Sequence, residues 1–409
     1  MSGQNHLINR VSATELSAIY LYWVTMAMVI LASVIQYVIG YYGGDLDGEN
    51  YKVNHYSLLF FTILYVIGLY GSYHVSRLMS RLKFSRYHVN FRSKHVLSFV
   101  FVFFSLMVVF FALWGGVGTI NRGVQTNRYA ELFFALFDPY ILMILMIYFV
   151  YLNFGKSLYD RVILSLLVVI YLFLTIRSGF TSFLILLLPV FFLMLLSFMS
   201  KVKAIIIMIV ALASFPFIRI GKWIVGGFSL SDINSDLILV ATRGVIERFS
   251  AVPNMIFIND FLVNKDVFLQ TSYLPFFQGY LGSFFHKLFF LTPVSLNTLY
   301  LHQIIHDTTT DSNSTFPILS YFSLDIYIGV MSLLYFFFLI FVLSYLLNTI
   351  FGRSILGRGL MCFFLFYVVF FYAFNGWFWS VCGVIQSSIL FIILLALIGK
   401  ITSYKRLEI

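Results

Sequence analysis

The sequence predicts an all-α polytopic membrane protein with about ten transmembrane helices and one large folded extracytoplasmic loop. Hydrophobic residues make up 61% of its 409 positions and charged residues only 10%, whereas in a soluble domain roughly a quarter of the residues are charged. The apolar residues also gather into runs long enough to cross about 30 Å of hydrocarbon as helices. Helices are the expected spanning form, because lipid cannot satisfy open backbone groups.

The predicted spans divide the chain into three regions. Seven spans fall in 1–220, the large outer loop occupies 221–325, and three further spans fall in 326–409, which ends in a short tail. The first apolar run is too long for the core of a cleavable signal peptide, so it is expected to remain as a membrane anchor. The ten runs are 17–42, 56–75, 96–118, 131–153, 162–177, 181–199, 204–220, 326–348, 359–378 and 380–399.

The distribution of basic residues predicts that both termini are cytoplasmic. With the N-terminus inside, sixteen of the 26 Lys and Arg residues fall in cytoplasmic segments, against three acids, Glu15, Asp160 and Glu408. Most of these basic residues lie in short loops, where an excess of positive charge marks the cytoplasmic side. The net charge of +10 is therefore a topology signal, and it gives no reason to expect nucleic acid as a partner.

The long loop has the composition of a folded cap rather than of a linker. It is rich in Phe and is interrupted by four prolines. Apolar residues at near-helical spacing predict a helix over 232–262, capped by Ser231 or Asp232. The stretch 276–291 is expected to lie in the membrane interface.

Three arginines on the predicted outer side are candidates for binding an anionic group. Arg177 stands in an Arg-Ser-Gly turn between two predicted spans, and Arg243 and Arg248 lie five positions apart in the loop. A guanidinium can hold a phosphate through two parallel hydrogen bonds. As alternatives, Arg177 reaches the lipid headgroups, and Arg243 forms an ordinary ion pair with Glu247 four positions along.

The segment from His302 to Asp307 offers candidate acid–base groups. His302 and His306 share a helical face, but a third metal ligand is missing and position 303 is Gln where zinc hydrolases place Glu. We therefore expect no metal and no other cofactor. Each histidine alone is equally well explained as a solvated loop residue. The sequence contains neither a phosphate-binding glycine loop nor a nucleotide-sugar motif, so chemistry that uses ATP or a nucleotide sugar is not expected.

Other polar positions have simpler explanations. Arg219 and Lys222 lie at the exit of the seventh predicted span, and both are candidates either for substrate binding or for anchoring to headgroups. The segment 45–50 resembles only the opening of a calcium loop, and we interpret it as a polar turn. Cys362 and Cys382 are expected to be small buried hydrophobic residues.

In layout and in several short motifs the chain resembles the Wzy family, the bacterial polymerases of lipid-linked oligosaccharide repeat units. The layout is that of many spans with a large outer loop in the second half of the chain. O-antigen ligases, which are related, carry a histidine in this loop, and His302 or His306 is the nearest candidate here. The motifs that carry the resemblance are Arg177-Ser-Gly, Arg243…Arg248-Phe-Ser, Gln278-Gly-Tyr280-Leu-Gly, and the run from Ser314 to Gly329 that includes Pro317, Tyr321 and Asp325.

The resemblance implies a GT-C-like fold and a metal-independent glycosyltransferase at the periplasmic face of the bacterial inner membrane. Such an enzyme transfers a growing glycan from undecaprenyl pyrophosphate onto a new lipid-linked repeat unit, in the synthesis of O-antigen (lipopolysaccharide) or capsule. The implied catalytic residues are Arg177, Arg243, Arg248, His302, His306 and Asp307. The implied substrate-binding residues are Arg219, Lys222, Tyr280 and Tyr321.

The same resemblance sets the expected partners and the alternatives. The partners are an undecaprenyl-pyrophosphate-linked oligosaccharide and the lipid bilayer, with a chain-length regulator and a flippase as further candidates. One alternative is a flippase for the same lipid-linked sugar, and another is an O-antigen ligase. Charges are nearly absent from the centres of the predicted spans and the two halves of the chain differ, which favours the enzyme over a transporter.

Overall fold

The computed structural model describes most of the chain, and the description below covers those residues alone. They are 2–46, 51–82, 87–91, 93–117, 126–154, 157–178, 181–214, 216–217, 220–221, 224, 234–247, 249–262, 296–305, 315–352 and 354–403.

Seven of the described helices are long and apolar enough to cross a membrane. Each coincides with one of the predicted runs, which confirms the prediction of a polytopic helical membrane protein. Six of the seven helices end within a few residues of the predicted limits. The sixth and seventh are separated only by a short turn at 375–377. The helices are α1 (Ser2–Ile39), α2 (His55–Arg81), α3 (Lys94–Trp114), α6 (Leu158–Ser178), α16 (Ile326–Phe351), α17 (Ile355–Tyr367, continued by the π-helical segment Val368–Phe374) and α18 (Phe378–Ile398).

An eighth predicted span is bent sharply in its first half. Helices α4 (Arg128–Phe137) and α5 (Pro139–Asn153) meet at 44°. Asp138 between them has a left-handed backbone, with φ of 33°. Pro139 explains the break, because it lacks the N–H that would bond to Ala135 and it disfavours helical geometry at the preceding residue. Gln386 of α18 compensates by donating through Nε2 to the carbonyl of Leu136 at 2.8 Å.

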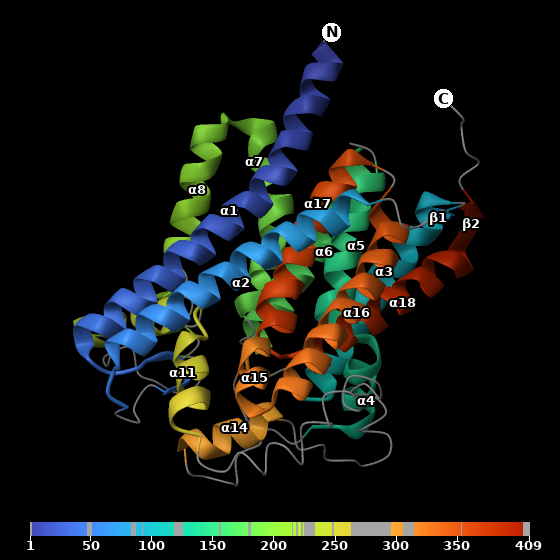
Figure 1. The fold of residues 1–409 in the computed structure, drawn as a ribbon. Helices are drawn as coiled ribbons and strands as arrows, with labels where there is room; N and C mark the ends of the chain where they lie inside the picture. The colour runs from blue at the N-terminus through green and yellow to red at the C-terminus, as the bar shows by residue number, and fades with distance from the viewer. Residues whose placement is uncertain are drawn as a thin grey trace.

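The two remaining predicted spans, 181–199 and 204–220, coincide in part with shorter described helices. A 3₁₀ segment, η2 (Thr181–Leu187), leads into α7 (Leu188–Phe198), and α8 (Lys201–Ala213) follows. Figure 1 shows α7 and α8 as an antiparallel pair beside α1. Neither described helix reaches the roughly 20 residues of a full span, and part of the predicted run 204–220 lies outside the described residues, so the expected total of ten spans stays a prediction.

The connections between the helices fall at two opposite ends of the bundle. The start of α1, the α7–α8 turn and a small antiparallel ladder of β1 (Tyr87–Phe91) with β2 (Gly399–Ser403) lie at the upper end in Figure 1. The lower end carries α4 and three short helices, α11 (Val252–Asp260), α14 (Leu296–Ile305) and α15 (Tyr321–Leu324). The start of α1 and the end of β2 therefore lie at the same end of the bundle, and the cytoplasmic location of the termini stays a prediction. The ladder itself was not predicted.

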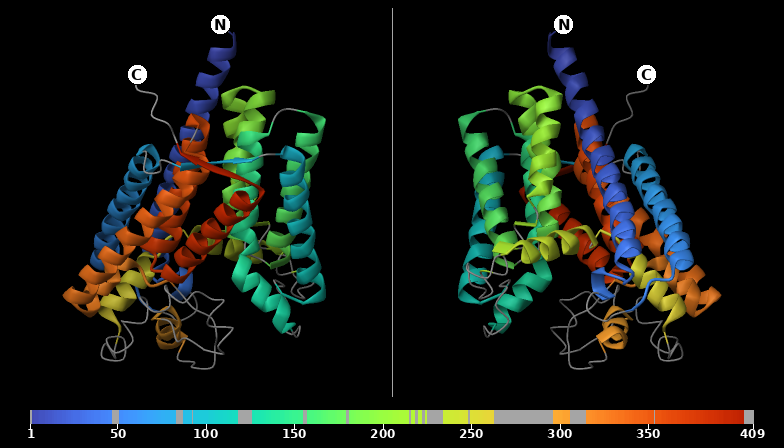
Figure 2. Two further views of the ribbon diagram at one scale, coloured as in Figure 1. Left: turned by 90° about the vertical axis from the view of Figure 1, so that its right-hand side faces the viewer. Right: turned by 90° about the vertical axis from the view of Figure 1, so that its left-hand side faces the viewer.

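The described parts of the long loop are helical and lie at the lower end of the spans (Figure 2). They are α10 (Ser235–Glu247), α11 (Val252–Asp260), α14 (Leu296–Ile305), η4 (Ile318–Ser320) and α15 (Tyr321–Leu324). The prediction of a single helix over 232–262 is wrong: α10 ends at Glu247, and α11 starts at Val252 with Pro253 in its first turn. The predicted caps, Ser231 and Asp232, lie outside the described residues; at the start of α10, Asn234 Oδ1 accepts the N–H of Leu237 at 2.8 Å, as an N-cap residue does.

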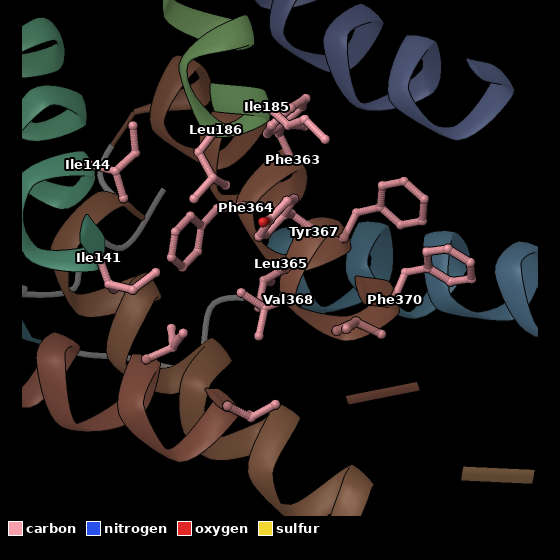
Figure 3. Close-up of a cluster of buried hydrophobic side chains, with 14 of the residues drawn as sticks. Ile141, Ile144, Ile185, Leu186, Phe363, Phe364, Leu365, Tyr367, Val368 and Phe370 are labelled. Carbon is pink, nitrogen blue, oxygen red and sulfur yellow. The ribbon is translucent and has the colours of Figure 1, made fainter. Parts of the chain in front are cut away.

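Helix α17 is the centre of the bundle. In the most apolar stretch of its span 72% of the residues are buried, against 33–39% in each of the other six spans. Figure 3 shows its aromatic residues Phe363, Phe364 and Tyr367 among Ile141 and Ile144 of α5 and the η2 residues Ile185 and Leu186. The other spans keep an apolar face outward, as expected for helices in contact with lipid. Cys362 on α17 is buried, Cys382 is half-buried, and neither forms a disulfide.

Candidate functional site

Arg177 lies in the last turn of α6, and its guanidinium reaches across to α3. Its Nη2 donates a 2.7 Å hydrogen bond to the carbonyl of Ala112. Its Nε is buried and has no hydrogen-bond partner among the described residues. The side chain does not extend freely toward headgroups in this arrangement, and it retains hydrogen-bonding capacity for an anionic group.

A cavity of about 180 Å³ lies beside the bend between α4 and α5. Asp138 from the bend, Tyr372 from the π-helical segment and Gln386 from α18 supply polar groups to its wall. A carboxylate within an otherwise apolar span is costly, so such groups are rare and tend to be functional. At about 30 Å³ per water molecule, the cavity accommodates a small polar group with its water, and not an oligosaccharide.

Tyr140 connects this cavity with Arg177. Its ring stacks on Phe183 at the cavity wall, with 5.1 Å between the centroids. Its hydroxyl lies within electrostatic range of both Asp138 and Arg177 and interacts with the Ser178 hydroxyl. We call Asp138, Tyr140, Arg177 and Ser178 the α5–α6 polar cluster. It joins an acid and a cation at the lower ends of these two helices.

A second polar network attaches α10 to the connection between α1 and α2. Glu247 is buried; its Oε1 accepts from Arg243 Nε at 2.7 Å, and its Oε2 accepts from the Gly44 N–H at 3.0 Å. Gly43 leaves the space for this carboxylate, because a Cβ there would overlap it. The ion pair raised as the simpler explanation of Arg243 is therefore formed in the structure.

The same connection is tied to α11 and to the segment that precedes η4. Asp45 Oδ2 accepts from the buried Asn254 Nδ2 at 2.8 Å and from the Thr315 N–H at 3.4 Å. Asn254 Nδ2 also donates to the Thr315 carbonyl at 3.1 Å. Asp45 therefore links α11 to the segment before η4, while 47–50, the rest of the segment interpreted as a polar turn, lie outside the described residues.

Two tyrosines beside this network are kept protonated by their surroundings. Burial raises the pKa of Tyr300 well above its usual value, and the nearby charge of Asp45 raises it further. Burial also raises the pKa of Tyr42, although the Asn54 N–H, which bonds to the Tyr42 oxygen at 3.0 Å, acts in the opposite direction. Neither phenol is suited to act as a base, and both serve as hydrogen-bonding and packing groups.

Four of the ten predicted site residues fall within the described parts of the chain. The contacts of Arg177 lead to α3 and α5, whereas those of Arg243 lead to Glu247 and Gly44, so the two arginines belong to different networks. His302 lies half-buried in the last turn of α14. Tyr321 is buried against Phe316, with 4.9 Å between the centroids, an environment that favours packing over sugar stacking. The remaining six, Arg219, Lys222, Arg248, Tyr280, His306 and Asp307, lie outside the described residues, as does the stretch 276–291.

Sequence reasoning missed the acid of the α5–α6 polar cluster as a site residue. Asp138-Pro139 interrupts the apolar run 131–153, and an acid followed by proline inside a span signals both a break and a buried carboxylate. Asn254 and Gln386 gave no comparable signal. Among the described residues, no group of three or more His, Cys, Asp and Glu side chains is placed to hold a metal ion.

Replacing Glu247 with Gln is expected to loosen the attachment of α10. The amide keeps the size of the side chain but supplies only one oxygen, so either Arg243 or Gly44 loses its acceptor. Removal of one partner from a buried hydrogen bond costs about 1–3 kcal/mol, and thermal unfolding of the purified protein measures this loss. Asp260→Asn is the control, because the exposed Asp260 accepts from Ser57 at 3.1 Å and should cost less than about 1 kcal/mol. Equal effects from the two variants would contradict a structural role for Glu247.

Comparison of this chain with protein-family models, with curated proteins and with solved structures gave no match.

Proposed function

We propose that the protein is a polysaccharide polymerase of the Wzy type in the bacterial inner membrane, with both termini cytoplasmic. It transfers a growing glycan from undecaprenyl pyrophosphate to a new lipid-linked repeat unit at the periplasmic face, in O-antigen or capsule synthesis. The long loop contributes a folded cap at that face. No metal or other cofactor is required, because the donor sugar arrives already activated by its pyrophosphate.

The observation that carries the proposal is the position of Arg177. It is a half-buried cation at the end of a span, and its buried Nε is not bonded within the described residues. The bond that breaks in the proposed reaction joins a sugar to a pyrophosphate, so negative charge develops on the departing oxygen. A fixed guanidinium in a water-poor site stabilises that charge.

Proton transfer requires a second group near the acceptor hydroxyl. His302, His306 and Asp307 remain our candidates, since a histidine or a carboxylate can accept that proton. Asp138 joins them, because Tyr140 places it within the same polar cluster as Arg177. Arg243 is assigned a supporting role in the cap, since it is bound to Glu247.

The bend at Asp138 also favours a second candidate, a transporter for the same lipid-linked sugar. Transporters bind substrates where a helix is broken within the membrane, using charged groups and exposed backbone at the break. The α4–α5 bend, the nearby cavity and the acid at its wall share these properties. Charges are nearly absent from the centres of the predicted spans and the two halves of the chain differ, so the polymerase stays our preferred function.

Deletion of the gene followed by analysis of surface glycan separates the two functions. A polymerase mutant should lose long chains but keep single repeat units on lipid A, because export and ligation do not need polymerisation. A flippase or ligase mutant should lose every repeat unit from the surface. Complementation with the wild-type gene must restore the long chains, and a surface without any repeat units would reject the polymerase proposal.

A further inference from the structure

A cavity of about 370 Å³ opens at the end of the bundle opposite to Arg177. It lies between α1, the last turns of α2 and the first turns of α17, at the upper end in Figure 1. Three arginines line it, Arg77 and Arg81 from α2 and Arg358 from α17. Among the described residues of its wall there is no acid.

Arg358 is the best placed of the three to bind a ligand. It is half-buried, and its Nε is buried without a hydrogen-bond partner among the described residues. A buried donor that is left unbonded costs about 1–3 kcal/mol, so its retention is easiest to understand if a ligand supplies the acceptor. Arg358 lies in the first turn of α17, where Ser354 caps the helix by accepting from Gly357 N–H at 2.9 Å. The positive end of the helix adds to the field of the arginines.

We propose that this cavity binds a phosphate group, and that on the predicted cytoplasmic face this group belongs to an anionic lipid. Guanidinium groups match phosphate oxygens in shape and charge. Basic pockets between transmembrane helices on the cytoplasmic side are suited to anionic headgroups. The exposed Ile355 at the rim and Ile19 on α1 provide apolar surface for the adjoining acyl chain. This site is independent of the proposed polymerase chemistry.

The bound phosphate would lie where α1 and α2 meet α17, the most buried helix of the bundle. Helix α17 packs against both α1 and α2, and a phosphate in the cavity would lie between Arg358 of α17 and Arg77 of α2. The alternative is that an acid of the same chain neutralises the arginines of the cavity. Asp160 is already paired with Lys94, and Glu15 lies one helical turn before Ile19 in the sequence of α1. If Glu15 neutralised the cavity, added phosphate compounds would find no site.

The test uses the full-length protein in phosphatidylcholine nanodiscs, titrated with dioctanoyl phosphatidylglycerol or with inorganic pyrophosphate. The midpoint of thermal unfolding should rise with ligand concentration and give a dissociation constant. Arg358→Gln should weaken binding about tenfold or more, because a charge-assisted hydrogen bond is removed. The dissociation constant of Arg358→Lys should lie between those of the wild type and Arg358→Gln, since lysine keeps the charge but not the planar guanidinium.

Arg161→Gln is the matched control, because Arg161 is exposed at the same end on α6 and does not line the cavity. It should leave the dissociation constant within about twofold. If Arg358→Gln fails to fold, Arg77→Gln replaces it, since Arg77 lines the same cavity from α2. Saturable binding of the lipid alone supports a headgroup site, and equal binding of pyrophosphate supports a site for soluble phosphate compounds. Absence of saturable wild-type binding, or an equal loss in Arg161→Gln, overturns the proposal.

Discussion

Replacing Arg177 with alanine is expected to reduce glycan chain extension about 10²–10³-fold, the loss typical when one fixed donor to a developing negative charge is removed. The guanidinium also donates to the Ala112 carbonyl, so the variant removes both the cation and one link between α6 and α3. Chain length on gels of surface polysaccharide measures the result in cells. Transfer between purified lipid-linked repeat units measures it directly.

Two further variants separate charge from folding in this prediction. Arg177→Lys keeps the charge but loses the planar fork, so it should retain part of the activity. Arg128→Ala removes an arginine that is exposed at the start of α4, and it should leave chain extension unchanged. Protein amount in the membrane must stay constant among the variants. Wild-type chain lengths in Arg177→Ala would remove this residue from the site.

Hydropathy predicts most of this fold because lipid imposes one simple condition. Each span must be helical and apolar throughout, so α1 and α16 could be located from composition alone. Hydropathy does not indicate whether a helix runs unbroken through a span. The break at Asp138 can be predicted only from the proline that follows it. The ladder between β1 and β2 was not foreseen, because it pairs two segments that lie far apart in the sequence.

The candidate site was predictable only where a single residue carries the signal. Arg177 stands out because a cation at a tight turn between spans is conspicuous in the sequence. Its neighbours Tyr140 and Ala112 come from α5 and α3, and no spacing rule connects them with it. Glu247 bonds to Gly44 across 203 positions, and a backbone N–H has no sequence identity to recognise. The pairing with Arg243 was foreseeable, because it follows the four-residue helical spacing.

Replacing Gly376 with alanine is expected to destabilise the junction between the cap and the bundle by about 2–5 kcal/mol. Gly376 has φ of +76° and lies in the turn between the π-helical segment and α18, and a Cβ there would overlap the carbonyl oxygen of Phe316. The left-handed conformation alone costs an alanine about 1–2 kcal/mol, and overpacking adds about 1–3 kcal/mol. The backbone cannot move away easily, because Phe316 is buried and the Trp377 N–H bonds to the Tyr372 carbonyl at 2.8 Å.

Alanine substitutions at two other glycines separate the conformational cost from the steric cost. Gly40 has φ of +80° but nothing lies within 4 Å of the added Cβ, so Gly40→Ala should cost only the conformational term of about 1–2 kcal/mol. Gly71 is helical with equally open surroundings, and Gly71→Ala should stabilise by about 0.5–1 kcal/mol. Thermal unfolding in one detergent should therefore rank Gly71→Ala above the wild type, then Gly40→Ala, then Gly376→Ala. If Gly376→Ala equals Gly40→Ala, the approach of Phe316 to this turn is not a close contact in the protein, and the cap is attached through the Asp45 and Glu247 networks instead.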